Sequence, residues 1–302
     1  MIIIKFLIIG ATGFLGNKLI NIFKENHEVI GTYNKTKNEQ YEFLDISDKK
    51  AVKLLIEKTT PDIIINTSHI PNANTEEMKE LAEKINSNGP KNLADVCNTY
   101  YEETGDIDTK NKITLIHMST DFIFDGEKGN YTEEDLPNPI SHYGKTKLKG
   151  EQGVIKYQNH IILRVSTLYG YNKPTDKKFT NWIINSLKDG KEIKIINDQF
   201  TCPTLINDIG KAILKLLELN KIGIYNCVGS EKISRYKFAV KVAEIFGLNK
   251  TLIKSISMND LKQNIIRPKN TTLDISKLKS EEIQMSNINE GLTTMKNEMG
   301  VV

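Results

Sequence analysis

The fold is decided by the stretch IIGATGFLG, residues 8–16, where an apolar run ends at three closely spaced glycines. Gly10, Gly13 and Gly16 follow a predicted strand at 2–10 and open a predicted helix at 14–25. Glycine permits a tight turn, and it lets a pyrophosphate approach the backbone N–H groups at the positive end of a helix. Strand, turn and helix in this order predict a dinucleotide-binding turn. The further cofactor contacts predicted within it are Thr12, Phe14 and Leu15.

Strand-like and helix-like segments alternate through the first half of the chain. The apolar runs are rich in β-branched residues without polar alternation, which is typical of strands buried on both faces. After the first, the predicted strands are 27–33, 41–45, 61–68, 113–120 and 160–170. Helical patterns fill 49–58 and 75–101, the second interrupted at 88–90, where Pro90 can open a new helix; the polar residues 102–112 predict a loop. This order predicts an α/β protein with a doubly wound parallel sheet, a Rossmann fold.

The second half lacks this regular rhythm and predicts a smaller, C-terminal substrate-binding region. The elements expected there are helices at 179–188, 206–219, 234–246 and 287–298 and a strand at 223–229. We therefore expect a dinucleotide-binding Rossmann domain at 1–168, to which 204–228 return. The smaller substrate-binding domain is expected to comprise 169–203 and 229–302.

Composition and charge narrow the classes of function. The 302-residue chain is 39% hydrophobic and 26% charged, as in ordinary globular proteins. Its net charge of +3 is small and its lysines are scattered, so neither a nucleic-acid nor a membrane partner is expected. Three distant cysteines fit neither a disulfide framework nor a metal-ligand spacing, which indicates a reducing, cytoplasmic setting. Lys5 interrupts the apolar start and no small-residue cleavage site follows, so no signal peptide is expected.

The end of the second predicted strand distinguishes between the two nicotinamide dinucleotides. A carboxylate there binds the ribose 2′-hydroxyl of NAD, whereas a cation suits the 2′-phosphate of NADP. The sequence has Asn34 and Lys35, with Lys37 nearby and no acid at the turn, so NADP(H) is preferred and NAD(H) is the alternative. Solvated loop lysines are the competing interpretation. Asp45 and Ile46, after the third strand, are expected to meet the adenine edge, with a helix N-cap as the alternative for Asp45.

Polar residues at the end of the fifth predicted strand and on the next helix form a candidate catalytic group. Ser119 and Thr120 emerge at the carboxyl edge of the sheet, where open α/β folds bind ligands. Tyr143 and Lys147 stand four residues apart and share one face of a helix. Because an ammonium stabilises a phenolate, the pair can give a proton to a carbonyl oxygen as hydride reaches its carbon. Thr120 would polarise that oxygen. A merely structural pair is the alternative.

These motifs, with others in the same order, resemble one family over most of residues 5–275. The matching stretches are GATGFLG, PDIIINTS, INSNGPKNLAD, STDFIFDG, YTEEDLPNPISHYGKTKLKGE, ILRVSTLYG, DQFTCPTLINDIGKAI, GIYNCVG and IRPKNTTLD. The chain resembles an extended short-chain dehydrogenase/reductase of the dTDP-4-dehydrorhamnose reductase family. The resemblance implies a catalytic triad of Thr120, Tyr143 and Lys147, the glycines as phosphate loop, and NADPH as the usual cofactor. Thr67 and Ser68 are further expected cofactor contacts, as are Tyr143 and Lys147 themselves.

Three residues are expected to contact the substrate. They are Ser119, Gln199 in DQFTCPT and Arg267 in IRPKNTTLD. Guanidinium groups suit phosphates, so Arg267 is a candidate partner for a diphosphate, with a surface salt bridge as the alternative. The alternative for Gln199 is a purely structural role in its loop. The chain departs from the family pattern at Thr167, where a tryptophan is usual, and at Asn74, where an acid would fall. Asn74 lies outside the residues that the structure describes.

The resemblance implies an NADPH-dependent reductase of a 4-keto-6-deoxy sugar nucleotide, as in dTDP-L-rhamnose biosynthesis. The sequence is also similar to the regulatory β subunit of methionine adenosyltransferase, which binds NADP without needing turnover. A sugar-nucleotide epimerase of the same fold is a third hypothesis. The expected partner is a small-molecule sugar nucleotide, and a homodimer is compatible with the sequence. His117 is expected to be a core residue, and no metal site is expected because His69 and His142 lack a third ligand at metal spacing.

Overall fold

The computed structural model describes residues 3–71, 75–104, 112–172, 178–260 and 267–301, without the side chains of 101–104. The chain divides into two compact units. Unit 1 comprises Met1–Ile123, Ser141–Arg164 and Leu216–Tyr225. Unit 2 comprises Phe124–Ile140, Val165–Lys215 and Asn226–Val302. The main differences from the expected domains are 124–140 and 204–215, which group with unit 2. The first of these does so because Tyr131 forms a bridge with Leu273 and its N–H donates to the Thr272 carbonyl at 2.9 Å.

Unit 1 is built on a seven-stranded sheet in the order β11-β6-β5-β4-β1-β2-β3. The strands are β1 (Lys5–Ile9), β2 (Glu28–Tyr33), β3 (Glu42–Phe43), β4 (Ile63–Asn66), β5 (Thr114–Thr120), β6 (His160–Val165) and β11 (Gly223–Asn226). β1 pairs in parallel with β2 and with β4, and β4 pairs in parallel with β5. The chain adds β2 and β3 on one side of β1 and β4 to β6 on the other. The predicted Rossmann sheet is thereby confirmed, and its topological switch point lies between β1 and β4.

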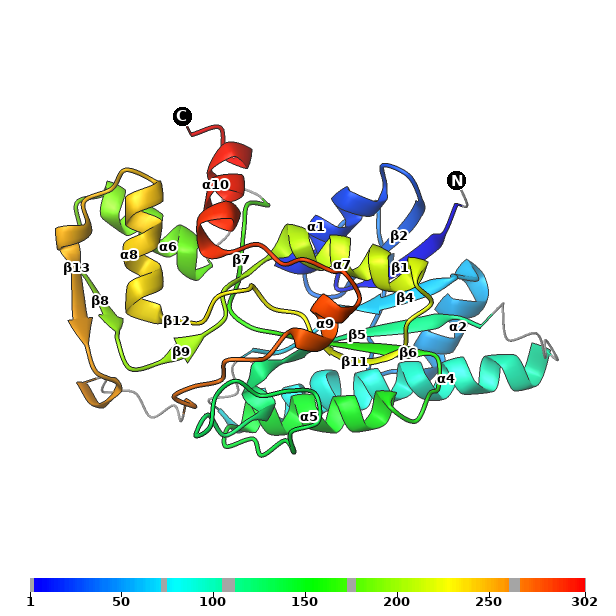
Figure 1. Cartoon of the computed structure of the whole chain (residues 1–302). Helices are drawn as coiled ribbons and strands as arrows, with labels where there is room; N and C mark the ends of the chain where they lie inside the picture. Colours follow the sequence, from blue (N-terminus) through cyan, green and yellow to red (C-terminus); the bar gives the residue numbers. More distant parts are fainter. Residues whose placement is uncertain (1–2, 72–74, 105–111, 173–177, 261–266, 302) are drawn as a thin grey trace. The chain divides into compact units, whose positions relative to one another are not determined.

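Helices cover both faces of this sheet. They are α1 (Phe14–Phe23), α2 (Lys49–Thr59), α3 (Glu76–Ala82), a π-helical turn (Glu83–Asn88), α4 (Gly89–Thr104) and α5 (His142–Val154). Phe6 of β1 stacks on Phe23 of α1, with ring centroids 4.6 Å apart. Leu7, the next residue of β1, joins a core with residues of α2, α4 and α5. Successive strand residues point to opposite faces, so α1 covers one face and α2, α4 and α5 the other. Figure 1 shows α4 and α5 side by side.

Two expected boundaries differ from the structure. The helix interruption at 88–90 is absent, because α3 runs through the π-helical turn directly into α4. Pro90 is the second residue of α4, and the helix continues to Thr104. The strand expected at 160–170 ends at Val165, and Leu168–Tyr169 form a separate strand, β7. Thr167 between them has a φ of +38°, which breaks the extended backbone.

Unit 2 is a mixed α and β unit with its own core. Its helices are α6 (Phe179–Lys188), α7 (Ile206–Glu218, whose last turn belongs to unit 1), α8 (Arg235–Ile245), α9 (Ser276–Ser280) and α10 (Ile288–Glu298). Its strands are β7, β8 (Ile193–Ile196), β9 (Phe200–Thr201), β10 (Thr204–Leu205), β12 (Ile233–Ser234) and β13 (Ile253–Ile256). They pair two by two, β7 with β10, β8 with β13 and β9 with β12. Side chains of α6, α8 and α10 pack together around Phe238 and Leu292.

Candidate active site

The carboxyl ends of three neighbouring strands bring five of the predicted site residues of unit 1 to one edge of the sheet. Gly10 follows β1, Thr67 and Ser68 follow β4, and Ser119 and Thr120 are the last residues of β5. The strand order places β4 between β1 and β5. This edge at the switch point is where open α/β sheets bind their ligands.

The glycine turn after β1 is too compact for side chains. Gly10 has a φ of +81°, and the Gly13 N–H donates to the Gly10 carbonyl at 2.9 Å. A Cβ atom on Gly16 would lie 2.3 Å from the Gly10 oxygen, and one on Gly10 would lie 2.9 Å from the Thr67 hydroxyl oxygen. Glycine is therefore required at the first and third positions for close backbone packing.

The first turn of α1 has no side-chain cap. Gly13 is the N-cap residue without a side chain to cap the helix, and the turn contains no acidic residue. The Phe14 and Leu15 side chains are buried, so these residues can offer a ligand only their backbone, whereas Gly13 is exposed and Thr12 partly so. An uncapped helix start behind a glycine turn fits the pyrophosphate of a dinucleotide.

Thr67 and Ser68 shape the neighbouring strand end. The Thr67 hydroxyl donates to the Ile9 carbonyl at 2.8 Å. The Ser68 hydroxyl and its backbone N–H both donate to Asn66 Oδ1, at 2.6 Å and 3.1 Å. Because each hydroxyl proton is already used within unit 1, these side chains can offer a ligand only acceptor lone pairs.

The two candidate lysines in the turn after β2 have different surroundings. Asn34 Nδ2 donates to the Leu44 carbonyl at 3.0 Å, which ties this turn to β3. Lys37 forms an ion pair with Glu39 at 3.7 Å. Lys35 is exposed, and no ion-pair partner for it occurs in the part of the chain that the structure describes. Lys35 is thus the better candidate for a phosphate contact.

Asp45 and Ile46 occupy different settings. Asp45 Oδ1 accepts hydrogen bonds from the Ser47 N–H and hydroxyl, at 2.9 Å and 2.6 Å. The N-cap of α2 is Asp48, which accepts two N–H groups of the first turn, so the N-cap alternative for Asp45 is wrong. The Ile46 side chain is buried in the core, and its carbonyl accepts from Asn92 at 3.1 Å. Ile46 can therefore contact a cofactor with its backbone only.

Thr120 at the end of β5 meets Tyr143 of α5, and Ser119 precedes Thr120 in the strand. The Thr120 side chain is hydrogen-bonded to the Tyr143 hydroxyl and donates to Asp121 Oδ1 at 3.1 Å. Ser119 is 3% exposed, and its hydroxyl has no hydrogen-bond partner among the described residues. The Tyr143 ring meets Phe122 edge to face, with centroids 6.1 Å apart. An orphaned buried hydroxyl beside a threonine–tyrosine pair suits a polar ligand.

Tyr143 is held in its protonated form. Burial raises the pKa of its hydroxyl to about 12, the hydrogen bond with Thr120 lowers it, and the negative charge of Asp121 raises it. At neutral pH the phenol therefore carries its proton, as a general acid must. Release of that proton needs a cation to stabilise the phenolate.

Lys147 supplies a buried cation one helical turn further along α5. Its side chain is 1% exposed, and Nζ donates to the Met118 carbonyl at 2.5 Å. Burial lowers the pKa of this amine to about 8, while the charge of Glu151 raises it. Lys147 therefore titrates much nearer to neutrality than an ordinary lysine.

A buried ion pair behind Lys147 was not anticipated from the sequence. Arg164 of β6 donates to both carboxylate oxygens of Glu151, at 3.2 Å and 2.9 Å, and both side chains are almost fully buried. Tyr143, Lys147 and Glu151 follow one another at intervals of four residues along one face of α5. That spacing could have indicated that Glu151 shares the helix face of Lys147. The arginine that pairs with Glu151 comes from another element, β6, and the spacing gives no sign of it. A two-point contact of this kind holds both partners rigidly.

Two of the three predicted substrate contacts, Gln199 and Arg267, belong to unit 2. Gln199 is buried and its Nε2 donates to the Pro268 carbonyl at 3.1 Å, while its Oε1 has no hydrogen-bond partner among the described residues. Arg267 precedes Pro268 and is partly buried. The Thr167 hydroxyl oxygen lies 2.6 Å from that of Thr201. The orphaned Gln199 oxygen is thus available to a ligand.

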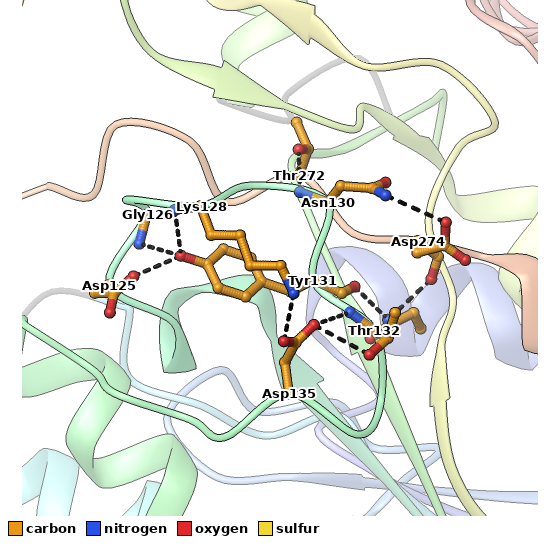
Figure 2. Close-up of polar contacts among 10 residues, drawn as sticks. Asp125, Gly126, Lys128, Asn130, Tyr131, Thr132, Asp135, Thr272 and Asp274 are labelled. Atoms are coloured by element: carbon orange, nitrogen blue, oxygen red, sulfur yellow. Dashed lines mark hydrogen bonds and ion pairs between the residues drawn. The ribbon is translucent and has the colours of Figure 1, made fainter.

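The loop at 124–140 is organised by polar contacts rather than by acid–base chemistry. The Tyr131 hydroxyl donates to Asp125 Oδ1 at 2.5 Å and accepts the N–H groups of Gly126 and Lys128, as Figure 2 shows. Hydrogen bonds, first that from Tyr131, hold the pKa of Asp125 below its ordinary value. Asp125 also accepts the Glu127 N–H at 3.1 Å, so its carboxylate shapes the turn.

Other classes of site are not evident within the described ranges. No group of three or more His, Cys, Asp or Glu residues there could hold a metal ion. His117 is fully buried and hydrogen-bonded, as expected of a core histidine. None of the helices in these ranges is both long enough and apolar enough to span a membrane.

Comparison with known proteins gives consistent matches along the whole chain. The sequence matches the protein family described as "RmlD substrate binding domain" over residues 4–301. It is 31% identical to the probable low-salt glycan biosynthesis reductase Agl14 of Haloferax volcanii, over 90% of both chains. It is 32% identical to methionine adenosyltransferase 2 subunit beta of Xenopus laevis, over 90% of this chain and 80% of that relative.

A solved structure is also similar to this chain over nearly its whole length. The fold is similar to that of the dTDP-4-dehydrorhamnose reductase from Bacillus anthracis in complex with NADP. The TM-score is 0.86 at 26% sequence identity, and the match covers 98% of this chain and 100% of that one. The match therefore extends through both units.

Proposed function

The chain belongs to the RmlD substrate binding domain family, and on that premise we propose that it is an NADPH-dependent reductase of a 4-keto-6-deoxy sugar nucleotide. The observation that carries the proposal is the hydrogen-bonded pair of Thr120 and Tyr143 beside the buried Lys147. The uncapped glycine turn at the same sheet edge supports a dinucleotide. NADP is favoured over NAD because Lys35 is a cation without a carboxylate partner among the described residues, and because the Bacillus anthracis relative was solved with NADP.

The proposed chemistry divides between three side chains. NADPH, when bound, supplies the hydride. In the proposed reaction, Thr120 turns its hydroxyl proton from Asp121 to the substrate carbonyl oxygen and so polarises it. Tyr143 gives its proton to that oxygen as the carbonyl becomes an alcohol, and the Lys147 ammonium stabilises the phenolate that remains. Lys147 is also the proposed contact for the ribose hydroxyls of the cofactor.

The remaining site residues are proposed to bind rather than to react. In unit 1, the orphaned Ser119 hydroxyl is a proposed contact for the reacting sugar. In unit 2, the Gln199 oxygen is a proposed sugar contact and Arg267 a proposed partner for the diphosphate. Substrate affinity, rather than proton transfer, is the property that these residues would govern.

The test is oxidation of NADPH in the presence of dTDP-4-keto-6-deoxy-L-mannose. Tyr143→Phe removes the proton donor and is expected to lower kcat by about 10²–10⁴-fold, with NADPH binding retained. Tyr157→Phe is a matched control, because the Tyr157 hydroxyl donates to the Ile113 carbonyl at 2.6 Å at the amino end of β5. The control is expected to keep its turnover. Equal activity of the Tyr143→Phe variant and the wild type would remove the proposed role of Tyr143.

A regulatory subunit is the second candidate, favoured by the 32% identity to methionine adenosyltransferase 2 subunit beta. Such a protein needs the glycine turn but has no need of the Tyr143 proton. The two candidates separate with the wild type alone. If it binds NADPH but oxidises none with a panel of dTDP-, UDP- and GDP-linked keto sugars, the reductase proposal fails. A binding assay with a methionine adenosyltransferase catalytic subunit then tests the second candidate.

A further inference from the structure

A buried histidine joins the end of β4 to the catalytic lysine. Asn66 and His117 are register partners on neighbouring strands, and Asn66 Nδ2 lies 3.2 Å from His117 Nδ1. The other ring nitrogen, Nε2, lies 3.4 Å from Lys147 Nζ. All three side chains are almost fully buried, so no bulk water competes for these contacts. Strand alternation sets Asn66 and His117 on the sheet face that α4 and α5 cover, in line with Ile64 and Leu115 of the core there.

The hydrogen bonds around Asn66 determine where the ring proton lies. Asn66 Oδ1 accepts from the Ser68 N–H and hydroxyl, and a backbone N–H can only donate. The amide oxygen therefore faces Ser68, and Nδ2 faces the His117 ring. Nδ2 is a donor, so His117 Nδ1 must be the unprotonated acceptor. Burial, and then the charge of Lys147, hold the pKa of His117 well below its ordinary value. The neutral ring therefore carries its proton on Nε2.

In this tautomer of His117, the hydrogen-bond donor Nε2–H faces another donor, the Lys147 ammonium. The His117 Nε2–H faces the Lys147 amine, and a fully protonated ammonium has no lone pair to accept it. The ammonium is left with the Met118 carbonyl as its acceptor, whereas an uncharged amine could accept from Nε2–H. Of the other charged or titratable groups, Glu151 of α5 acts on Lys147 through its charge and is itself paired with Arg164 of β6. Tyr143 lies one turn earlier on α5 and feels the charge of Asp121.

We propose that His117 is a positioning residue for Lys147, locked by Asn66 in the Nε2–H tautomer, so that it directs the amine to the Met118 carbonyl and weakens its hold on a proton. The tautomer that Asn66 fixes in His117 does not depend on the reaction. Its catalytic consequence rests on the proposed reductase function, because the Lys147 charge is what stabilises the Tyr143 phenolate. Asn66 and His117 would thus adjust the pH range in which the tyrosine can act.

Asn66→Asp reverses the proposed lock while nearly keeping the shape of the side chain. The new carboxylate can only accept, so the ring proton moves from Nε2 to Nδ1, where Nδ1–H donates to the carboxylate, and Nε2 becomes an acceptor for the ammonium. The Lys147 pKa is then expected to rise by about one unit, helped by the added negative charge. Asn88→Asp is the matched control, because Asn88 is exposed in the same unit and undergoes the same change of charge.

The tautomer can be measured by NMR of the ring nitrogens in histidine-labelled protein. The chain has five histidines, and His117→Phe assigns the signal. We expect an unprotonated Nδ1 in the wild type and in Asn88→Asp, and a protonated Nδ1 in Asn66→Asp. A protonated Nδ1 of His117 in the wild type would overturn the proposal. If His117→Phe does not fold, a signal that moves in Asn66→Asp alone identifies the ring.

The proton affinity of Lys147 can be followed by NMR of labelled lysine, with Lys147→Met for assignment. We expect the Lys147 titration to move upward in Asn66→Asp and to stay in place in Asn88→Asp. The basic limb of the pH–rate profile should move with it. An unmoved Lys147 titration in Asn66→Asp overturns the proposal even if the enzyme is active. If the titration moves but no keto sugar is reduced by the wild type, the reductase function fails and the role of His117 stands.

Discussion

Lys147 is a buried cation near neutral pH, and its burial costs stability. Its pKa falls from the ordinary 10.5 to about 8, so the folded chain holds this proton less tightly than the unfolded chain. Between these pH values the unfolded state binds more protons, so the free energy of unfolding rises as the pH rises from about 8 toward 10.5. Below about pH 8 the penalty is fully present, and a shift of this size corresponds to about 3 kcal/mol.

Lys147→Met should therefore stabilise unit 1 while it removes the proposed activity. At pH 7 we expect the free energy of unfolding to rise by about 1–2 kcal/mol, because relief of the burial penalty exceeds the loss of the hydrogen bond to Met118. The gain should shrink by pH 9.5, where the wild-type amine is already mostly neutral. Urea denaturation at both pH values measures this. The titration of Tyr143, raised to a pKa of about 12, lies above this range.

Lys145→Met provides the control for that experiment, since Lys145 is exposed on the same helix. Its effect should stay within about 0.5 kcal/mol at both pH values. A stability gain in Lys147→Met that is the same at pH 7 and pH 9.5 would show that the charge of Lys147 is not its cause.

At the scale of elements, the turn after β2 offers a test of cofactor choice. Lys35→Ala removes the cation proposed to meet the 2′-phosphate. The Kd for NADPH should rise about fivefold, the equivalent of about 1 kcal/mol for an exposed charge pair. The Kd for NADH, which lacks that phosphate, should not change. Fluorescence titration of each dinucleotide measures both constants.

Lys37→Ala is the control, because Lys37 is already paired with Glu39. This substitution should leave the Kd values for NADPH and NADH unchanged. Equal weakening of NADPH and NADH binding by Lys35→Ala would mean that Lys35 supports the turn rather than the phosphate. The alternative that both lysines are solvated loop residues corresponds to no change in either variant.

The helical segment from α3 to α4 shows why local sequence signals were insufficient. Asn-Gly-Pro at 88–90 is typical of a helix break, yet the helix continues through a π-helical turn. Within that turn, Asn86 accepts the Ile70 N–H at 2.8 Å and donates to the Ile70 carbonyl and to the Thr146 hydroxyl. These contacts tie the turn to the segment after β4 and to α5, next to Lys147. π-helical turns within α-helices are often found at functional sites.

At the scale of the whole molecule, all the predicted cofactor contacts belong to unit 1. NADPH at one hundred times its Kd should stabilise the state that binds it by about 2.7 kcal/mol. Hydrogen exchange should slow in unit 1, chiefly at residues 9–16 and at the ends of β4 and β5. The loop at 124–140 and helix α10, both in unit 2, should exchange as before. Protection that appears chiefly in unit 2 would contradict the assignment of the cofactor site.

The sequence by itself determined the strands of unit 1 and most of its helices, the sheet edge that carries the candidate site, and the glycine turn. These follow from local rules: the period of strands and helices, the backbone freedom of glycine, and the i,i+4 spacing that sets Tyr143 and Lys147 on one helix face. The site residues predicted from them lie at the strand ends and on α5, where their proposed roles can be tested.

Only the tertiary structure decided what surrounds Lys147 and to which unit the loop at 124–140 belongs. The Met118 carbonyl, the His117 ring and the Glu151–Arg164 pair come from separate elements. A proton's affinity for an amine depends on how deeply packing buries that amine and which charges it brings near. Neither property is local in the sequence, because segments far apart in the chain must pack together before a side chain acquires its surroundings.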